Sequence, residues 1–348
     1  MEFIKPDIDI NFIGRRYVAF ALSAILILTT ASLLIFKGGL NLGVDFTGGV
    51  LIQVKMEAKE TPSKLKEALK SINLHDSIIQ EFGEDNEYLI RVIKVDIETA
   101  GLQEEVEKAL DDYFGQVVEI RRVEMVGPTV GKDLRQKALK AIFFAILFIA
   151  IYISGRFELK WVMSIVMALS LVIIVYILSS FGASITWLII IALFVSICLC
   201  WVLKLKYAMG AIIALIHDVI ITLGAFAITD REISLSIIAA LLTIVGYSLN
   251  DTIVVFDRIR ENLRKYRRKE VEGVINSSIN ETLSRTLLTS STTLFVVIAL
   301  FILGGGVIHD FAFALLVGIL VGTYSSIFVA SPILLTWEAS FNREGKKV

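Results

Sequence analysis

The chain has few of the residues that build disulfide or metal sites. Among its 348 residues are two cysteines, Cys198 and Cys200, and both lie inside one apolar run. We expect them to pack as small side chains, because nothing in their spacing indicates a disulfide framework or a zinc site. The HExxH, CxxC and GxSxG signatures are also missing. The sequence therefore gives little support for an enzyme, and it predicts no metal and no cofactor.

An excess of charge of either sign is missing as well. The 34 Lys and Arg residues nearly balance the 35 Asp and Glu residues, for a formal net charge of −1. This balance predicts no global attraction to nucleic acid, so only the local placement of charge can indicate function.

Apolar residues dominate what is present. They make up 55% of the chain, and the mean hydropathy is +0.74. A soluble domain of this length is less apolar, so lipid is expected to be the main solvent. A membrane span needs about 20 apolar residues. Spans are predicted on that criterion at residues 17–36, 138–154, 207–229, 234–256, 286–308 and 311–337.

One further run, residues 161–203, contains no charged residue. Its length is about twice what one helix needs, so we predict an inserted pair of helices. Small residues at positions 179–184 mark the turn between them. The expected fold is a membrane α-helical bundle of about eight transmembrane helices, six core helices plus this pair. The first apolar run lacks a clear cleavage site and is predicted to be retained.

The basic loops predict which side of the membrane each end faces. Lys and Arg in short loops stay on the cytoplasmic side, and every basic loop of this sequence falls on one face. Both termini are then cytoplasmic, with residues 1–16 as the leading segment and 338–348 as the tail. Residues 37–137 are expected to form a periplasmic domain, and residues 138–337 the remaining membrane bundle.

The external stretch has a readable order of elements. Alternating apolar and polar residues predict strands at 50–56, 76–82, 88–95 and 117–125, and helical spacing predicts helices at 63–72 and 101–114. The resulting β-α-β-β-α-β order is typical of a small ferredoxin-like α+β domain, with both helices on one face of an antiparallel sheet.

Ionisable residues inside the predicted spans are the strongest chemical signal. Charge in hydrocarbon is costly and is usually retained for transport or paired for structure. For Asp251 a functional role is favoured over snorkelling to the nearby cytoplasmic end. His217 and Asp218 lie in mid-span, where an interhelical hydrogen bond explains them as well as a functional role does. Arg285 opens a later span and is by itself compatible with a positive-inside anchor.

Three other patterns have ordinary explanations. Residues 43–49 read Gly-Val-Asp-Phe-Thr-Gly-Gly. They lack the Gly-Lys-Ser/Thr ending of a phosphate loop, so a turn where the first span meets the external domain is favoured. Gly318 and Gly322 match the small-xxx-small pattern for close helix packing. The basic run 258–269 favours a solvated cytoplasmic face near anionic lipid over a nucleic-acid site.

Three segments together resemble the SecF family of protein-export subunits. They are residues 43–49, residues 246–262 beginning Gly-Tyr-Ser-Leu-Asn-Asp-Thr, and residues 321–330. The second is long and specific. Shorter matching segments at 126–131, 156–158 and 211–218 occur in the expected order, so the resemblance covers most of the chain.

The resemblance implies a subunit that works with SecD beside the SecYEG translocon, with YajC and YidC as further partners. It would use the proton-motive force to help draw unfolded preproteins across the bacterial inner membrane, and it would be related to the resistance-nodulation-division transporters. Proton transport is implied for Asp251 and Arg285, with an acidic partner on SecD. The family motif and hinge positions are Gly43, Asp45, Gly48, Gly49, Gly127 and Pro128.

One departure and two alternatives accompany this resemblance. Family members usually have six spans, so the inserted pair leaves open how that face of the bundle meets its partners or lipid. A self-sufficient small-molecule exporter is a second hypothesis, but the external domain is only about one small-domain unit. A passive translocon scaffold is a third, and the membrane carboxylate Asp251 favours transport over it.

Overall fold

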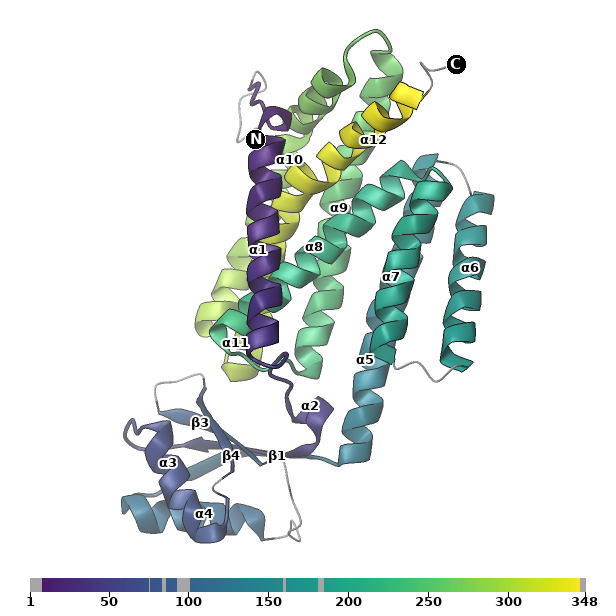
Figure 1. Ribbon diagram of the computed structural model, residues 1–348. Coiled ribbons are helices and arrows are strands. Elements are labelled where there is room, and N and C mark those ends of the chain that lie inside the picture. Colours follow the sequence, from purple (N-terminus) through teal and green to yellow (C-terminus); the bar gives the residue numbers. More distant parts are fainter. Residues whose placement is uncertain are drawn as a thin grey trace.

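The protein consists of a helical bundle with a small sheet domain at one end (Figure 1). The computed structural model describes residues 8–74, 76–82, 86–92, 101–158, 161–180 and 185–344. The start of α1 and the end of α12 lie at the end of the bundle opposite the sheet domain. The architecture of membrane-length helices with one small α+β domain is confirmed.

The sheet domain has the predicted β-α-β-β-α-β order. Its elements are β1 (Gly49–Lys55), α3 (Pro62–Ala68), the 3-10 turn η2 (Leu69–Ile72), β2 (Ile78–Glu81), β3 (Glu87–Val92), α4 (Leu102–Phe114) and β4 (Glu119–Val126). All strand pairs are antiparallel, in the order β2-β3-β1-β4. This is the ferredoxin-like arrangement, in which each strand–helix–strand unit crosses over one neighbouring strand.

Strand alternation gives the sheet two different faces. Val50, Ile52 and Val54 of β1 are fully buried in one apolar cluster with Leu65 of α3 and Leu110 of α4. Side chains one position along, such as those of Leu51, Gln53 and Arg91, belong to the opposite face because successive strand residues point to opposite sides. That second face carries no helix of the domain, and it is the face turned toward the bundle.

The remaining elements form and extend the bundle. They are η1 (Ile13–Arg15), α1 (Arg16–Phe36), the one-turn α2 (Val44–Thr47), α5 (Pro128–Glu158), α6 (Trp161–Ser180), α7 (Ile185–Val202), α8 (Lys206–Thr229), α9 (Leu235–Lys265), α10 (Val271–Leu303), α11 (Gly306–Ser325), the π-helical turn η3 (Ser326–Ala330) and α12 (Ser331–Glu344).

The predicted count of eight spans is not confirmed. Within the described ranges, seven helical segments are long and apolar enough to cross a membrane, one of them formed by α11, η3 and α12 together. The shortfall lies in α7, where the apolar stretch found in the described residues is the shorter Ile190–Val202. Both helices of the predicted inserted pair, α6 and α7, are present beside α5 at the edge of the bundle (Figure 1). The predicted turn falls partly on residues 181–184, which lie outside the described residues.

Several helices continue beyond the predicted spans. α5 begins at Pro128, where residue 138 was expected, and α9 continues to Lys265, beyond the expected residue 256. These extensions are rich in Lys, Arg, Gln, Glu and Leu, which favour helix in water as well as in lipid. Hydropathy therefore located the apolar middles of these helices and missed their polar ends.

The small-xxx-small prediction for α11 is confirmed by its contact with α9. A Cβ at Gly318 would lie 2.4 Å from Cδ1 of Ile244, and one at Gly322 would lie 2.8 Å from Cβ of Ser248. Neither position has room for a side chain without movement, so the two glycines allow α9 and α11 to approach closely.

Candidate functional site

Two carboxylates lie buried inside the bundle on adjacent helices. Asp218 of α8 is 1% exposed and Asp251 of α9 is 2% exposed. Both were predicted as site residues, and both are held by hydroxyl groups from neighbouring helices. Such carboxylates are costly in an apolar bundle, which marks the region as a candidate proton-handling site.

The carboxylate of Asp218 has three polar side-chain partners. Its Oδ2 accepts hydrogen bonds from Ser248 of α9 at 2.5 Å and from Ser325 of α11 at 2.9 Å. Its Oδ1 lies 2.9 Å from Nδ1 of His217. Three helices therefore meet at this one carboxylate.

His217 extends this cluster to the first helix. Its Nε2 lies 3.0 Å from Oγ of Ser23 on α1, and Ser23 lies 3.2 Å from the hydroxyl of Tyr324 on α11. That hydroxyl donates to the carbonyl of Ala19 at 2.8 Å. The sequence left open whether the His-Asp pair makes an interhelical hydrogen bond, and the structure shows that it does.

Asp251 has a smaller set of partners. Ser290 of α10 donates to its Oδ2 at 3.1 Å, and Ser290 lies 2.7 Å from the hydroxyl of Thr323 on α11. Because the side chain is turned into the bundle and buried, snorkelling to the cytoplasmic end does not describe its position.

Arg285 lies near Asp251 but makes no direct ion pair with it within the described residues. Its side chain is exposed on α10, and among the described residues it forms no ion pair with that carboxylate within 4.0 Å. The two residues belong to neighbouring helices, and the charge of Arg285 lies near enough to act on the carboxylate of Asp251. The role of Arg285 in proton transport therefore stays a prediction.

The predicted motif and hinge glycines meet where the sheet domain joins the bundle. Gly48 has φ +74° and Gly49 has φ +126°, conformations that side chains disfavour. A Cβ at Gly48 would lie 2.8 Å from Cα of Pro128, at the start of α5. The backbone before β1 and the backbone after β4 are therefore packed against each other at Gly48 and Pro128, and Gly127 forms the link between β4 and α5.

Asp45 of the same motif binds the start of α9. Its Oδ2 accepts a 2.7 Å hydrogen bond from the backbone amide of Leu235, the first residue of α9. Gly43 donates from its amide to the carbonyl of Ile233 at 3.0 Å, and Leu42 pairs with Ile233 in a parallel bridge. The motif thus binds the loop between the two helices that carry the buried carboxylates.

Arg91 of β3 completes this junction. Its guanidinium donates to the carbonyl of Leu42 at 2.6 Å and to Oδ1 of Asn41 at 3.0 Å, and it forms a 3.0 Å ion pair with Glu232 in the α8–α9 loop. Both side chains of the pair are largely buried. Burial raises the pKa of Glu232, and the charge of Arg91 opposes that rise.

The far end of α1 is tied to the same loop. Lys37 donates from Nζ to the carbonyl of Ala227, near the end of α8, at 2.8 Å, and it pairs with Asp230 at 3.1 Å. A cation at the C-terminal end of a helix satisfies free carbonyls and interacts favourably with the helix dipole.

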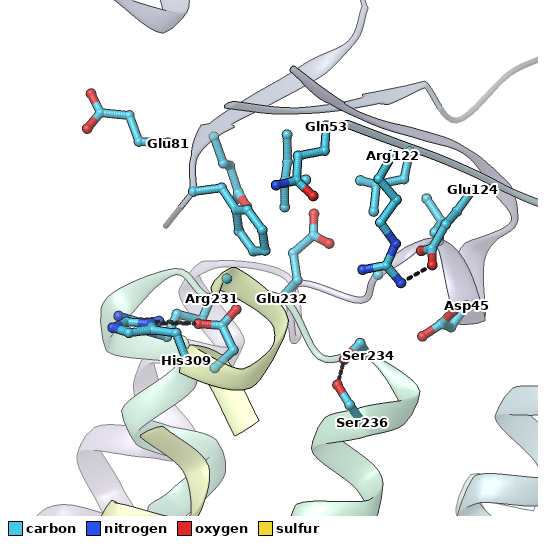
Figure 2. A pocket seen from close by; sticks show the side chains of 18 of the residues that line it. Asp45, Gln53, Glu81, Arg122, Glu124, Arg231, Glu232, Ser234, Ser236 and His309 are labelled. Atoms are coloured by element: carbon cyan, nitrogen blue, oxygen red, sulfur yellow. Dashed lines mark hydrogen bonds and ion pairs between the residues drawn. The ribbon is translucent and has the colours of Figure 1, made fainter. Parts of the chain in front are cut away.

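A cavity of about 750 Å³ lies between the open face of the sheet and these loops. Figure 2 shows Gln53, Arg122 and Glu124 reaching from the strands toward Glu232 and Ser234 of the α8–α9 loop. Asp45 lies at the same wall. Polar and apolar side chains both line this cavity. Beside it, Phe46 and Ile233 belong to a buried apolar cluster, so the junction combines apolar packing with polar contacts.

Sequence reasoning missed the hydroxyl groups and the junction. Ser23, Ser248, Ser290 and Ser325 are not among the predicted site residues, although serines recurring in spans could have indicated polar contacts between helices. Arg91 could have been noticed as a charged residue placed directly between the apolar residues Ile90 and Val92 of a predicted strand. Its partner Glu232 carried no comparable signal.

Comparison with protein families gives matches over most of the chain. Residues 105–198 and 184–340 match the family described as Protein export membrane protein SecD/SecF, C-terminal, and residues 33–60 match the SecD/SecF GG Motif. The GG-motif range, residues 33–60, contains Gly43, Asp45, Gly48 and Gly49 of the junction.

Individual relatives agree. The Protein translocase subunit SecF of Vibrio alginolyticus is 42% identical over 335 residues, covering 96% of this chain and 91% of that protein. The same-named subunit of Magnetococcus marinus is 42% identical over 348 residues, covering 99% of this chain and 97% of that protein.

Solved structures give the same result for the fold. The crystal structure of SecDF, a translocon-associated membrane protein from Thermus thermophilus, superposes with a TM-score of 0.73 at 30% identity. SecDF in a super-membrane-facing form superposes with a TM-score of 0.60 at 29% identity. This chain is covered at 97% and 98%, but it spans only 40% of the length of either SecDF chain.

Proposed function

The chain belongs to the SecD/SecF family of protein-export membrane proteins, and from this premise we propose how it works. It is a SecF-type, non-enzymatic subunit of the accessory complex of the Sec translocase, and it pairs with a SecD subunit. The pair uses the proton-motive force to promote the movement of unfolded preproteins through SecYEG, with YajC and YidC as further partners. The multi-pass chain lies in the inner membrane with both termini cytoplasmic and residues 37–137 periplasmic.

The observation that carries the proposal is the burial of Asp251. Its carboxylate is 2% exposed and accepts a hydrogen bond from a neutral serine. In the described part of the chain no Lys, Arg or His forms an ion pair with it. An ionised carboxylate without a cation is expensive in such surroundings, whereas a protonated one is tolerated. Asp251 therefore suits a site that takes up a proton and releases it when its surroundings change.

The exposed position of Arg285 supports a membrane partner. Charged side chains within spans nearly always face a bundle interior or a water-filled cavity. Arg285 instead lies on the outer surface of α10, and Asn250 of α9, beside Asp251 in the sequence, is exposed as well. A second bundle, such as the one that makes up the rest of a SecDF chain, would enclose both. An acidic residue on that second bundle would then compete with Asp251 for an ion pair with Arg285.

The junction supplies a route from the bundle to the outer domain. Asp218 lies on α8 and Asp251 on α9, and the loop between these helices is held by Asp45 and Arg91. A shift of α8 against α9 on proton binding would move this loop, and the sheet domain bound to it would change its orientation. Such movement could hold an emerging preprotein against backward sliding.

The test is proton flux and export in vesicles that contain the translocon, the SecD partner and this chain. Asp251→Asn keeps the size and much of the hydrogen bonding but removes the titrating group. It should leave assembly with SecD intact and abolish both proton flux and gradient-dependent export. Asp257→Asn, on the same helix and in an exposed pair with Arg156, is the matched control and should behave as the parent. Parent-like flux and export in Asp251→Asn would refute the role of Asp251.

The two alternatives make different predictions in the same vesicles. A stand-alone small-molecule exporter should conduct protons and move substrate without SecD. A passive scaffold should stimulate export equally with and without a proton gradient, and with either residue at position 251.

A further inference from the structure

Four polar contacts form a row that begins at Asp218 and ends at α1. They join Asp218 Oδ1 to His217 Nδ1 at 2.9 Å, His217 Nε2 to Ser23 at 3.0 Å, Ser23 to Tyr324 at 3.2 Å and Tyr324 to the Ala19 carbonyl at 2.8 Å. A carbonyl can only accept, so the one hydroxyl hydrogen of Tyr324 is committed to Ala19. Ser23 also has one hydrogen, and it can point either to Tyr324 or to His217.

With one proton bound to the His217–Asp218 pair, every contact in the row becomes a hydrogen bond. The proton between the two side chains can lie on His217 Nδ1, beside a carboxylate, or on the carboxyl group, beside a neutral ring. In both cases Nε2 carries a hydrogen and donates to Ser23, Ser23 donates to Tyr324, and Tyr324 donates to Ala19. The pair has no net charge in either arrangement, which suits its burial.

Loss of that proton removes one of the four hydrogen bonds. The hydrogen that remains on the ring must lie at Nδ1, facing the Asp218 carboxylate, so Nε2 becomes an acceptor. Ser23 then turns its hydrogen toward His217. The oxygens of Ser23 and Tyr324 are left facing each other without a hydrogen between them, and the buried pair carries a net charge of −1, both of which are unfavourable.

We propose that His217 and Asp218 form a second proton-binding site of the bundle, which takes one proton from water and returns it. The hydroxyl of Ser23 turns from His217 to Tyr324 when the proton arrives, so that proton binding strengthens the link between α1 and α11. Tyr324 lies two residues before the π-helical turn η3, an irregular segment of the kind that often accompanies functional sites. The use of this site in transport rests on the proposed function, whereas its proton binding can be measured without it.

The surroundings of the pair hold few other titratable groups. Tyr324 comes from α11, and Asp251 comes from α9, three residues after Ser248. Arg16 of α1 is seven residues before Ser23 and pairs with Glu272 at 2.8 Å. α7 carries Cys198 and Cys200 but no charged residue, and η3, residues 331–337 of α12 and residues 141–155 of α5 carry no charged residue either. A proton-dependent signal at His217 is therefore assigned to its pair with Asp218, with Asp251→Asn as the check for coupling between the two sites.

The test is nitrogen NMR of the full-length protein in lipid nanodiscs, with ¹⁵N-labelled histidine. The chain has three histidines, and the signal that is missing in His217→Gln belongs to His217. At low pH its Nε2 should carry a hydrogen, and as the pH rises Nε2 should lose it while Nδ1 keeps one. An Nε2 without hydrogen across the accessible pH range would overturn the proposal, because a purely structural pair keeps one neutral ring form throughout.

Two variants test the link to α1. Tyr324→Phe removes the acceptor that Ser23 needs only in the proton-bound form, so the pH midpoint of the Nε2 change should fall by roughly 0.7 unit, the size of one hydrogen bond. Tyr247→Phe is the matched control, because the hydroxyl of Tyr247 bonds Thr289 and Thr293 away from the row, and it should leave the midpoint unchanged. Equal midpoints in both variants would overturn the coupling to Tyr324. These NMR measurements need no proton gradient and no transport, so failure of the transport role proposed for Asp251 would leave both expected outcomes unchanged.

Discussion

The carboxylate of Asp45 accepts a 2.7 Å hydrogen bond from the backbone amide of Leu235, 190 residues away in the sequence. The first amides of a helix lack partners within the helix, and Ser234 before α9 makes no side-chain cap of its own. Asp45 therefore acts as the missing cap, supplied from another segment, and its negative charge also suits the N-terminal end of the helix dipole. This explains the acidic residue in the glycine motif without any nucleotide.

Asp45→Ala should weaken the start of α9. Loss of a helix cap costs about 1 kcal/mol, so the amide of Leu235 should exchange its hydrogen several-fold faster. Hydrogen exchange read by mass spectrometry on peptides from the α8–α9 loop measures this. Asp133→Ala removes an exposed carboxylate paired with Lys137 on α5 and serves as the control. Equal protection of the loop in parent and Asp45→Ala would show that Asp45 does not cap α9.

Arg91→Met should open the junction between the sheet domain and the bundle. The change leaves Glu232 buried without its cation, and breaking one side of a buried pair costs about 3 kcal/mol or more. Amide exchange at Gly43 and Ile233 should accelerate by about 100-fold, while the strands of the domain stay protected. Lys64→Met, in an exposed pair with Glu60, should leave both amides unchanged. Slow exchange at Gly43 in Arg91→Met would contradict a holding role for Arg91.

Glu232 should make part of the stability dependent on pH. Burial raises its pKa above the ordinary value of 4.5. A raised carboxyl pKa means that the folded state holds the proton more tightly, so this contribution is fully present below pH 4.5 and is lost as the pH rises through the raised pKa. The unfolding temperature of the parent, relative to Glu232→Gln, should therefore be higher at about pH 5 than at about pH 8. If the unfolding temperature of the parent relative to Glu232→Gln stayed constant with pH, or increased as the pH rose, the predicted pH dependence would be wrong.

Gly322→Ala should separate α9 from α11. The new methyl group would lie 2.8 Å from Cβ and 3.3 Å from Cα of Ser248, and the backbone of a packed helix cannot easily move. Overpacking of this kind costs about 1–3 kcal/mol, and it would also push Ser248 away from Asp218. Thermal unfolding in detergent should show the loss. Gly246→Ala is the control, because a Cβ there would meet nothing within 4 Å. It should be neutral or slightly stabilising, since alanine favours helix.

The sheet domain should fold without the bundle. Its core, which includes Val50, Ile52, Val106 and Leu110, draws only on its own elements, and no cysteine lies in it. Residues 48–127 expressed alone should show the circular dichroism of a mixed α/β protein and a cooperative thermal transition. Leu110→Ala should destabilise this fragment by about 2–5 kcal/mol, whereas Leu51→Ala, on the face that the bundle covers, should have a smaller effect. A random-coil spectrum in benign buffer would count against an independent domain.

The sequence by itself determined the membrane helices and the sheet domain. A run of about 20 apolar residues is long enough to cross the membrane as a helix. The alternation around Val50, Ile52 and Val54 can bury only one face of a strand. It also identified Asp218 and Asp251, because charge in an apolar run is conspicuous wherever it occurs. These features are local, so a reader of the sequence can find them without knowing what lies beside them.

Only the tertiary structure decided what these residues touch. The caps and ion pairs of the junction join residues 190 and 141 positions apart, Asp45 to Leu235 and Arg91 to Glu232. No periodicity records such distances. Serines such as Ser23 and Ser248 are unremarkable in an apolar run, and they acquire a role only because helix packing places their hydroxyls against His217 and Asp218. The sequence thus specifies which groups are costly to bury, whereas packing decides which partners make that burial tolerable.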